Sequence, residues 1–260
     1  MTKLDTNSQL NFIEFRGVSF RVDGLTNREI VSGVNLTIPH GKTLVLLGRS
    51  GSGKTTLLKL INGMLIPTEG EVLVQQRSTR QWDLIRLRRT IGYVIQEAGL
   101  FPHFTVAQNV ALVPTLENWP RERIDARVNE LLQLVGMAPK EFAHRRPREL
   151  SGGQRQRVGV ARALAADPPI LLMDEPFGAL DPVTRAELQR EFRSLARRLE
   201  KTIVFVTHDL REALFLASEI VLMQSSRVVA SAPASEFLKL PHPEVASFAA
   251  SLALGAGEPA

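Results

Sequence analysis

One short segment has the composition and spacing of a phosphate-binding loop. Residues 48–55 fit the pattern G-x-x-x-x-G-K-[ST]. Glycine lets backbone N–H groups turn toward an anion without a side-chain clash, and a helix that begins at the loop adds the positive end of its dipole. In this pattern Lys54 reaches the β- and γ-phosphates of a nucleotide, and the hydroxyl of Thr55 binds Mg²⁺. The expected nucleotide contacts are Gly48, Arg49, Ser50, Gly51, Ser52, Gly53, Lys54, Thr55 and Thr56.

Two adjacent carboxylates follow an apolar run later in the chain. Residues 170–173 are Ile, Leu, Leu and Met, and Asp174 and Glu175 come next. Ligand sites of open α/β sheets lie at the carboxyl ends of their strands. Asp174 is placed to hold Mg²⁺, directly or through water, and Glu175 to polarise the water that attacks the γ-phosphate. Alone, the pair would be read as the solvated end of a strand. Together with the phosphate loop, it predicts hydrolysis of a nucleoside triphosphate.

A second glycine-rich helix start lies at residues 151–154. Ser151 is a good N-cap, whereas Gly152 and Gly153 are poor helix formers at the head of a helix expected to run to about residue 165. Glycine fits there if another backbone or a phosphate approaches closely. The segment therefore reads as a second anion-binding helix terminus in a chain with one nucleotide loop, and a site on another subunit would explain it.

The elements that must position these groups alternate between strands and helices. Four apolar runs have strand length, and apolar residues at helical spacing follow Pro182. This order predicts a mainly parallel sheet covered on both faces. The four runs are residues 43–47, 169–173, 202–206 and 220–223.

A different pattern precedes the phosphate loop. Residues 11–22 and 34–38 alternate apolar with polar, and residues 23–27 have turn chemistry, which predicts an antiparallel sheet. Residues 105–165 are expected to be mostly helical. We expect a nucleotide-binding α/β core over 12–90 and 166–232, a helical subdomain with the Ser151 motif over 91–165, and a C-terminal helical tail over 233–260.

The composition excludes some classes of site. The 260 residues include no cysteine, which excludes disulfides and thiolate metal sites. The N-terminal residues have no apolar core of a signal peptide, and no apolar stretch approaches the ~20 residues of a spanning helix. Any membrane association is therefore expected through a partner. The net charge of +5 is read as a solvated basic face rather than a nucleic-acid surface.

Taken in order, these motifs resemble those of the ATP-binding subunits of ABC transporters. Gln96 after its strand, the run 150–154, the Asp174-Glu175 pair, residues 178–181 and His208 all occur in the family's order, over roughly residues 12–230. The resemblance implies an α/β fold: a P-loop NTPase (RecA-like) core with an antiparallel β subdomain and an inserted α-helical subdomain.

The resemblance also implies a head-to-tail homodimer that holds two ATP molecules and Mg²⁺ at its interface. Residues 151–153 of one subunit would close on the γ-phosphate held by Lys54 of the other. Gln96 would contact Mg²⁺ and water, Asp181 would couple the two sites, and His208 would sense the γ-phosphate.

The expected catalytic residues are Glu175, His208, Lys54 and Gln96. The expected Mg²⁺ ligands are Thr55, Gln96 and Asp174. The expected nucleotide contacts from the second motif are Ser151, Gly152, Gly153, Gln154 and Asp181.

Two positions depart from the family pattern, and the lesser of them is Gly178, which begins the Asp181 loop where serine is common. Where the family usually stacks an aromatic side chain on adenine, this chain has Val22. Phe20 lies on the same strand face by period two, and we expect it in the core.

A narrower resemblance concerns the transported solute. Residues 91–114 and 165–169 resemble the ATPases of osmoprotectant importers, which take up glycine betaine, carnitine, choline or proline betaine. The implied partners are transmembrane permease subunits and, through them, an extracytoplasmic solute-binding protein. We expect no nucleic-acid partner. The implied location is peripheral, on the cytoplasmic face of the cell (inner) membrane.

Other functions remain open at this point. Within transporters, the chain could energise import of amino acids or another small solute. Outside them, it could be a soluble ABC ATPase that acts on DNA or ribosomes. An ABC ATPase that acts on DNA would show a long coiled-coil insertion with cysteines at its hook. One that acts on ribosomes would show two cassettes in tandem. The sequence has neither feature. Phosphate binding without turnover is a third possibility, and Glu175 and His208 argue against it.

Overall fold

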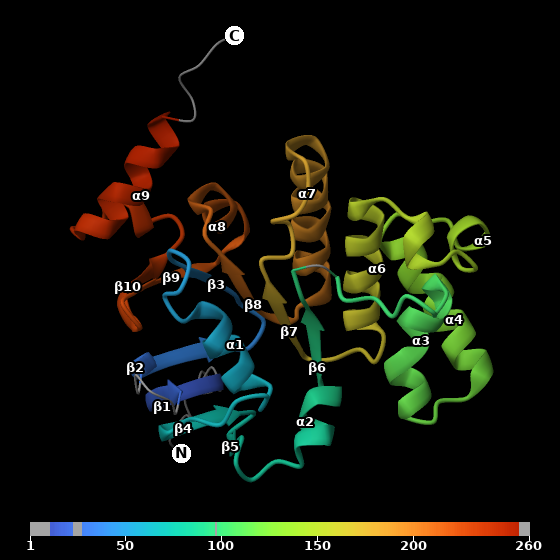
Figure 1. The fold of residues 1–260 in the computed structure, drawn as a ribbon, viewed down its shortest axis with the longest axis horizontal. Helices are drawn as coiled ribbons and strands as arrows, with labels where there is room; N and C mark the ends of the chain where they lie inside the picture. Colours follow the sequence, from blue (N-terminus) through green and yellow to red (C-terminus); the bar gives the residue numbers. More distant parts are fainter. Residues whose placement is uncertain (1–10, 23–27, 97, 255–260) are drawn as a thin grey trace, which may run out of the picture.

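The computed structural model describes residues 11–22, 28–96 and 98–254 of the chain. It contains a four-stranded sheet, a six-stranded sheet and helices that cover them (Figure 1). The turn expected over residues 23–27 lies outside the described residues, and so do residues 255–260 of the expected C-terminal tail.

The four-stranded sheet is antiparallel, as the alternating pattern predicted. Its strand order is β2-β1-β4-β5, and every pair of neighbours runs antiparallel. Strand β2 begins earlier than the expected residue 34. The strands are β1 (Asn11–Val22), β2 (Arg28–Pro39), β4 (Glu69–Val74) and β5 (Arg77–Ser78).

The six-stranded sheet carries the phosphate loop. Its order is β10-β9-β3-β8-β7-β6, and its strands are parallel except for the antiparallel pair β9–β10. The predicted, mainly parallel sheet is therefore confirmed. The strands are β3 (Thr43–Leu47), β6 (Ile91–Val94), β7 (Ile170–Asp174), β8 (Thr202–Thr207), β9 (Glu219–Gln224) and β10 (Arg227–Pro233).

The helices fall into two groups around this sheet. Helices α3 to α6 gather beyond the edge strand β6, whereas α1, α7 and α8 pack along the sheet (Figure 1). The helices are α1 (Lys54–Ile61), α2 (Leu84–Arg89), α3 (Val106–Leu116), α4 (Arg121–Leu134), α5 (Pro139–Phe142), α6 (Gly152–Leu164), α7 (Pro182–Leu199), α8 (Leu210–Leu216) and α9 (Pro243–Leu254). Short 3₁₀ turns lie at Pro147–Glu149 and Phe237–Lys239.

The core lies on both faces of the six-stranded sheet. Successive residues of a strand point to opposite faces. In β3, Val45 and Leu47 belong to the cluster under α7, α8 and the α3–α6 group, whereas Leu44 and Leu46 belong to the cluster shared with α1 and the antiparallel sheet. A strand that is buried on both faces has little freedom to move, so its carboxyl end is a fixed point for functional side chains.

The position of strand β6 changes where the boundary of the helical subdomain is drawn. We expected residues 91–165 to form the helical subdomain, but β6 pairs with β7 in the central sheet, and the first helix after it begins at Val106. We therefore propose a boundary after Val94 instead of before Ile91.

Helix α6 rests directly on β6 at a glycine. A Cβ atom on Gly92 would lie 2.3 Å from the carbonyl oxygen of Ala163 and 2.5 Å from Cδ2 of Leu171. Those distances are far inside van der Waals contact, so only glycine allows the helix backbone to approach the strand this closely. The contact fixes α6 against the sheet edge.

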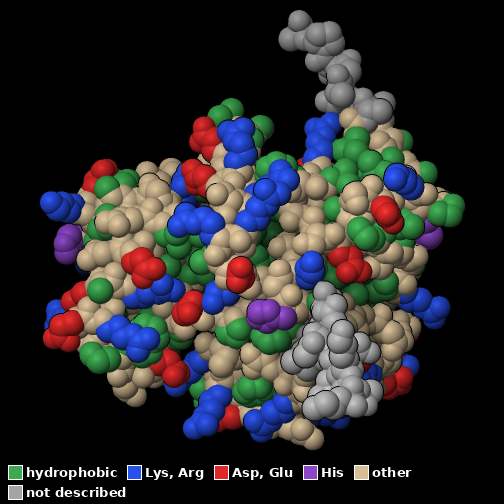
Figure 2. Space-filling view, turned by 180° about the vertical axis from the view of Figure 1, so that it is seen from behind, with side chains coloured by type: hydrophobic (Ala, Val, Ile, Leu, Met, Phe, Trp, Pro, Cys, Tyr) green, Lys and Arg blue, Asp and Glu red, His purple; other side chains and the backbone are tan. Residues whose placement is uncertain are grey.

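On the face drawn in Figure 2, the described Lys and Arg side chains are interspersed with Asp and Glu. None of the described helices combines the length and the hydropathy needed to cross a bilayer.

The Gly92 contact gives a stability prediction. The substitution Gly92→Ala is expected to lower the free energy of unfolding by roughly 1–3 kcal/mol, because the new methyl group overlaps a backbone carbonyl that cannot move freely. Urea unfolding followed by circular dichroism measures it. Gly152→Ala is the control, since its Cβ would meet no atom closer than 3.7 Å. Equal losses in the two variants would contradict this account.

Candidate functional site

The phosphate loop joins β3 to α1, and its conformation just before the helix requires glycine at position 53. Gly53 precedes the helix at φ +103°, and a Cβ atom there would lie 2.5 Å from the carbonyl oxygen of Ile30. No described side chain caps the N-terminus of α1. The first backbone N–H groups of a helix have no partner within the helix. They are therefore available to an anion, such as a phosphate, seated in the loop.

Lys54 is held inside this loop. Its side chain is buried, and Nζ donates hydrogen bonds to the carbonyl oxygens of Gly48 at 2.8 Å and Arg49 at 2.9 Å. Burial lowers the pKa of Lys54, and the nearby carboxylates of Glu175 and Asp174 oppose that effect. The loop thus positions a cation where the phosphates of a nucleotide would lie.

Asp174 receives hydrogen bonds on both carboxylate oxygens at the end of β7. Thr55 Oγ1 donates to Oδ1 at 2.8 Å, and the hydroxyl of Tyr93 donates to Oδ2 at 3.4 Å. Burial raises the pKa of Asp174, the hydrogen bond from Thr55 opposes the shift, and the charge of Glu175 adds to it. Sequence reasoning missed Tyr93. The signal was a tyrosine within a buried strand, because a buried hydroxyl needs a hydrogen-bond partner.

The oxygens of Thr55 and Asp174 fit a magnesium ion that a phosphate completes. Mg²⁺ is bound through one or two protein oxygens, with phosphate oxygens and water filling the other positions. Among the described residues, no three His, Asp or Glu side chains converge as a metal cage. The pair at 2.8 Å is therefore suited to a nucleotide-bound cation rather than to a resident structural metal.

Glu175 and His208 meet beside the loop. Nδ1 of His208 lies 3.1 Å from Oε2 of Glu175. Glu175 has φ +43°, and its backbone N–H donates to the carbonyl oxygen of Val206 at 3.1 Å. A non-glycine residue in this left-handed region is uncommon and is held there by its surroundings. The structure thus brings together the ends of β7 and β8.

One cavity unites these groups with the phosphate loop. Its described lining is Arg49, Ser50, Glu175, His208, Ser247 and Phe248. The last two residues belong to helix α9, which sequence reasoning did not connect with the site. No motif marks them, and only the folded chain brings them here.

Gln96 lies on another side of Glu175. A Cβ atom on Gly178 would lie 3.7 Å from Nε2 of Gln96 and 3.8 Å from Oε2 of Glu175, so both side chains approach Gly178. Gln96 also lines a second pocket together with Gly152 and Leu180. The structure therefore places Gln96 next to the expected catalytic carboxylate, between the phosphate loop's cavity and the start of α6.

Ser151 and Gln154 form a capping box at the start of α6. The backbone N–H of Gln154 donates to Ser151 Oγ at 3.2 Å, and the backbone N–H of Ser151 donates to Gln154 Oε1 at 2.9 Å. A Cβ atom on Gly153 would lie 2.7 Å from Cγ2 of Thr184, so the close neighbour there is α7 of the same chain. Gly152 is exposed and has room around it, which leaves it open to a neighbour from outside.

Within one chain, the α6 start and the phosphate loop face different pockets. Residues 151–154 are not among the described residues that line the cavity of Glu175 and His208. Asp181 caps the N-terminus of α7, where its Oδ1 accepts the N–H of Thr184 at 3.0 Å, and these backbone hydrogen bonds lower the pKa of Asp181. The two predicted anion sites are thus separate in the single chain.

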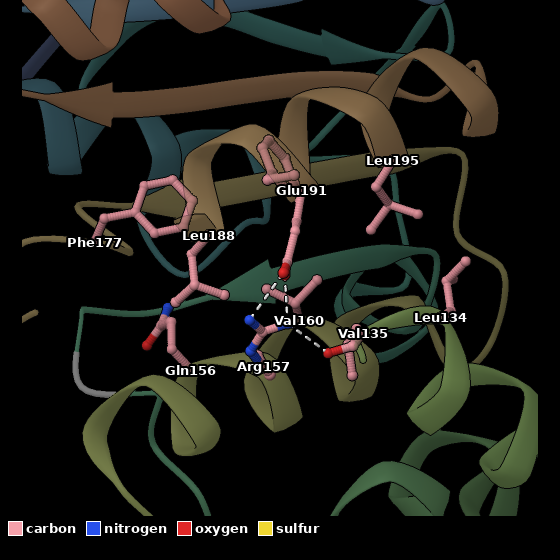
Figure 3. A pocket seen from close by; sticks show the side chains of 10 residues that line it. Leu134, Val135, Gln156, Arg157, Val160, Phe177, Leu188, Glu191 and Leu195 are labelled. Carbon is pink, nitrogen blue, oxygen red and sulfur yellow. Dashed lines mark hydrogen bonds and ion pairs between the residues drawn. The ribbon is translucent and has the colours of Figure 1, made fainter. Parts of the chain in front are cut away.

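A mostly apolar pocket lies between α6 and α7 (Figure 3). At its rim Arg157 donates to the carbonyl oxygen of Val135 at 2.8 Å and to both carboxylate oxygens of Glu191, at 3.0 Å to Oε1. One guanidinium therefore joins the end of α4, helix α6 and helix α7.

The position expected to stack on adenine is exposed. Val22 ends β1 with 51% of its surface exposed, while Phe20 packs against the hydrophobic core, as predicted. Val22 therefore faces solvent, whereas Phe20 is partly buried against the core.

Comparisons with known proteins agree with this geometry. The model of the ABC transporter family matches residues 31–178. The chain is 50% identical over 214 residues to the glycine betaine/carnitine/choline transport ATP-binding protein OpuCA of Bacillus subtilis, covering 82% of this chain and 56% of that protein. It is 53% identical over 202 residues to the glycine betaine uptake system ATP-binding protein YehX of Escherichia coli, covering 78% and 65%. The matched part of the chain thus spans 56% to 65% of the length of these relatives.

A solved structure has the same fold over nearly its whole length. It is the dimeric, post-hydrolysis ATP-binding cassette MJ0796 bound to ADP and Pi, with 34% identity and a TM-score of 0.78, covering 85% of this chain and 98% of that one. The predicted fold class is therefore confirmed.

The Thr55–Asp174 contact gives a prediction about the metal. In Thr55→Val the hydroxyl is lost at nearly constant volume, so the gain in ADP affinity that Mg²⁺ provides should fall by about tenfold. Thr55→Ser keeps the hydroxyl and should retain most of the gain. Calorimetric titration of ADP with Mg²⁺ and with EDTA measures both. A Thr55→Val variant with an undiminished Mg²⁺ effect would remove Thr55 from the ligand set.

Proposed function

The chain belongs to the ABC transporter family, and on this premise we propose that it is the ATP-binding and ATP-hydrolysing subunit of an importer. One observation carries the proposal. The phosphate loop, the Thr55–Asp174 pair and the Glu175–His208 pair lie together at the carboxyl ends of β3, β7 and β8. That arrangement supplies an anion cradle, a cation site and a water-orienting base in one place.

We assign roles to these residues from their positions. The uncapped start of α1 and Lys54 bind the β- and γ-phosphates. Thr55 and Asp174 would hold Mg²⁺, whose positive charge would neutralise charge that develops on the phosphates. Glu175 orients the attacking water and accepts its proton, and Gln96 contacts the same region from the other side of Gly178. His208, hydrogen-bonded to Glu175, keeps that carboxylate in place and contacts the γ-phosphate.

A homodimer would unite the two separated anion sites. The exposed Gly152, with Ser151, Gly153 and Gln154, would close on the γ-phosphate in the loop of a second copy, and Asp181 would lie between the two sites. The separation of the two pockets in one chain supports this proposal. The dimeric structure of MJ0796, which matches over nearly all of its length, supports it as well.

The names of the relatives support a proposal about the solute and the partners. OpuCA and YehX are ATP-binding proteins of glycine betaine, carnitine or choline uptake. We therefore propose an osmoprotectant quaternary amine as the solute, with permease subunits in the membrane, an extracytoplasmic binding protein, and a peripheral location on the cytoplasmic face. Import of amino acids or another small solute is the second candidate. The relatives give no support to a role on DNA or ribosomes.

Glu175→Gln tests the hydrolytic role. The amide cannot accept a proton from water, so the ATPase rate should fall by roughly 10²-fold or more, whereas ATP binding stays intact and an ATP-bound dimer accumulates. Single-turnover hydrolysis and size-exclusion chromatography with ATP measure the two effects. Glu187→Gln, on an exposed part of α7, is the control. Near-wild-type hydrolysis by Glu175→Gln would remove that role.

The solute is tested in the assembled transporter. The chain is reconstituted in liposomes with its permease and binding protein, and ATPase activity is measured with glycine betaine, choline, carnitine or an amino-acid panel. Quaternary amines alone should stimulate hydrolysis. Stimulation by another solute would leave the ATPase mechanism in place and reject the osmoprotectant assignment.

A further inference from the structure

The second residue of the phosphate loop is bound to the C-terminal helix. Nε of Arg49 donates to Oε1 of Glu244 at 2.6 Å, and Nη2 donates to Oγ of Ser247 at 3.1 Å. Glu244 and Ser247 are one turn apart on α9, so both face the loop. The guanidinium of Arg49 is therefore directed to α9.

Glu244 is a fixed anchor for this contact. Only 11% of its side chain is exposed, against 69% for Arg49. Its second oxygen, Oε2, accepts a hydrogen bond from Nε2 of Gln224 at 3.2 Å, at the end of β9. A carboxylate this buried is stabilised by a cation and by hydrogen bonds to both oxygens. The sheet therefore holds Glu244, and Glu244 holds Arg49.

The backbone of Arg49 extends the chain of contacts to the phosphate-binding lysine. The carbonyl oxygen of Arg49 accepts one of the two hydrogen bonds from Lys54 Nζ, at 2.9 Å, and also accepts the N–H of Ser52 at 3.3 Å. One residue thus has its side chain fixed by α9 and its carbonyl fixed to Lys54. Arg49 therefore connects helix α9 to the hydrogen bonding of Lys54.

Helix α9 also forms part of the wall of the same cavity. Ser247 and Phe248 line it together with Ser50, Glu175 and His208. The helix is held there from a further direction, because Nη2 of Arg211 on α8 donates to the carbonyl oxygen of Leu252 at 3.2 Å. The end of the described chain therefore borders the place where the γ-phosphate would lie.

We propose that helix α9 is a functional part of the phosphate site and that Glu244 is a positioning residue for it. Glu244 fixes Arg49, and through the carbonyl of Arg49 it sets the place of Lys54 and the shape of the loop that receives the nucleotide. The inference rests on the proposed nucleotide binding and adds to it residues that lie outside every motif described above.

Calorimetric titration with ADP and with the non-hydrolysable analogue AMP-PNP, both with Mg²⁺, tests the proposal on the purified full chain. Glu244→Gln and Arg49→Ala should each weaken binding by roughly fivefold to tenfold, the effect of losing one charge-assisted contact. The double variant should be no weaker than either single one, because both changes break the same contact. Glu117→Gln is the control, since it breaks the Arg89–Glu117 pair of 3.0 Å in a different pocket.

A second readout separates positioning from general stability. In the wild-type chain, AMP-PNP should slow amide hydrogen exchange in residues 243–254, and in Arg49→Ala it should not. The thermal unfolding midpoint should change little in Arg49→Ala or in Glu244→Gln. If Glu244→Gln fails to fold, Ser247→Ala takes its place. We expect a smaller loss of affinity for Ser247→Ala, because the hydroxyl that accepts the hydrogen bond from Arg49 is uncharged.

Three results would overturn the proposal. They are unchanged nucleotide affinity in both single variants, additive losses in the double variant, and tighter binding by Glu244→Gln, which would make Glu244 an anion that competes with the phosphates. In each case the wild-type chain still binds nucleotide and the proposed function stands. A wild-type chain that binds neither ADP nor AMP-PNP would count against the proposed function itself.

Discussion

The hydrogen bond between Thr55 and Asp174 is the contact on which the rest of the site depends. It joins the first turn of α1 to the end of β7, although β8 lies between β3 and β7 in the sheet. The two side chains meet only because parallel strands present their carboxyl ends at one edge. The burial of β3, β7 and β8 on both faces then holds that edge rigid, so the distance between phosphate loop and cation ligand is a property of the whole sheet.

Sequence could predict what depends on local spacing. The phosphate loop, the Asp174–Glu175 pair and the parallel strands are encoded in short patterns, and the structure confirms the fold class they predict. The capping box of Ser151 and Gln154 is equally local, because the four residues involved are consecutive. Each of these features arises from a few neighbouring residues whose backbone conformation their own types select.

Sequence could not predict contacts that depend on where distant segments pack. Arg49 and Glu244 are 195 positions apart, and Tyr93 and Asp174 are 81 apart, with no motif linking either pair. The reading of Gly153 shows the same limit. Its spacing indicated a close approach of another backbone or a phosphate, whereas the closest contact within the chain is Cγ2 of Thr184. A pattern shows that space is needed and leaves open what fills it.

The contacts between α6 and α7 have a mechanical consequence. Gly153 against Thr184 sets the lateral spacing of the two helix starts, and Arg157 bonded to Glu191 joins the helices again, about one turn further along α6 and about two turns further along α7. The helices also run in the same direction, because both contacts ascend the two sequences together. Ser151 and Asp181, the N-cap residues of the two helices, therefore lie at the same end of the pair, and a change at one helix start has a short physical route to the other.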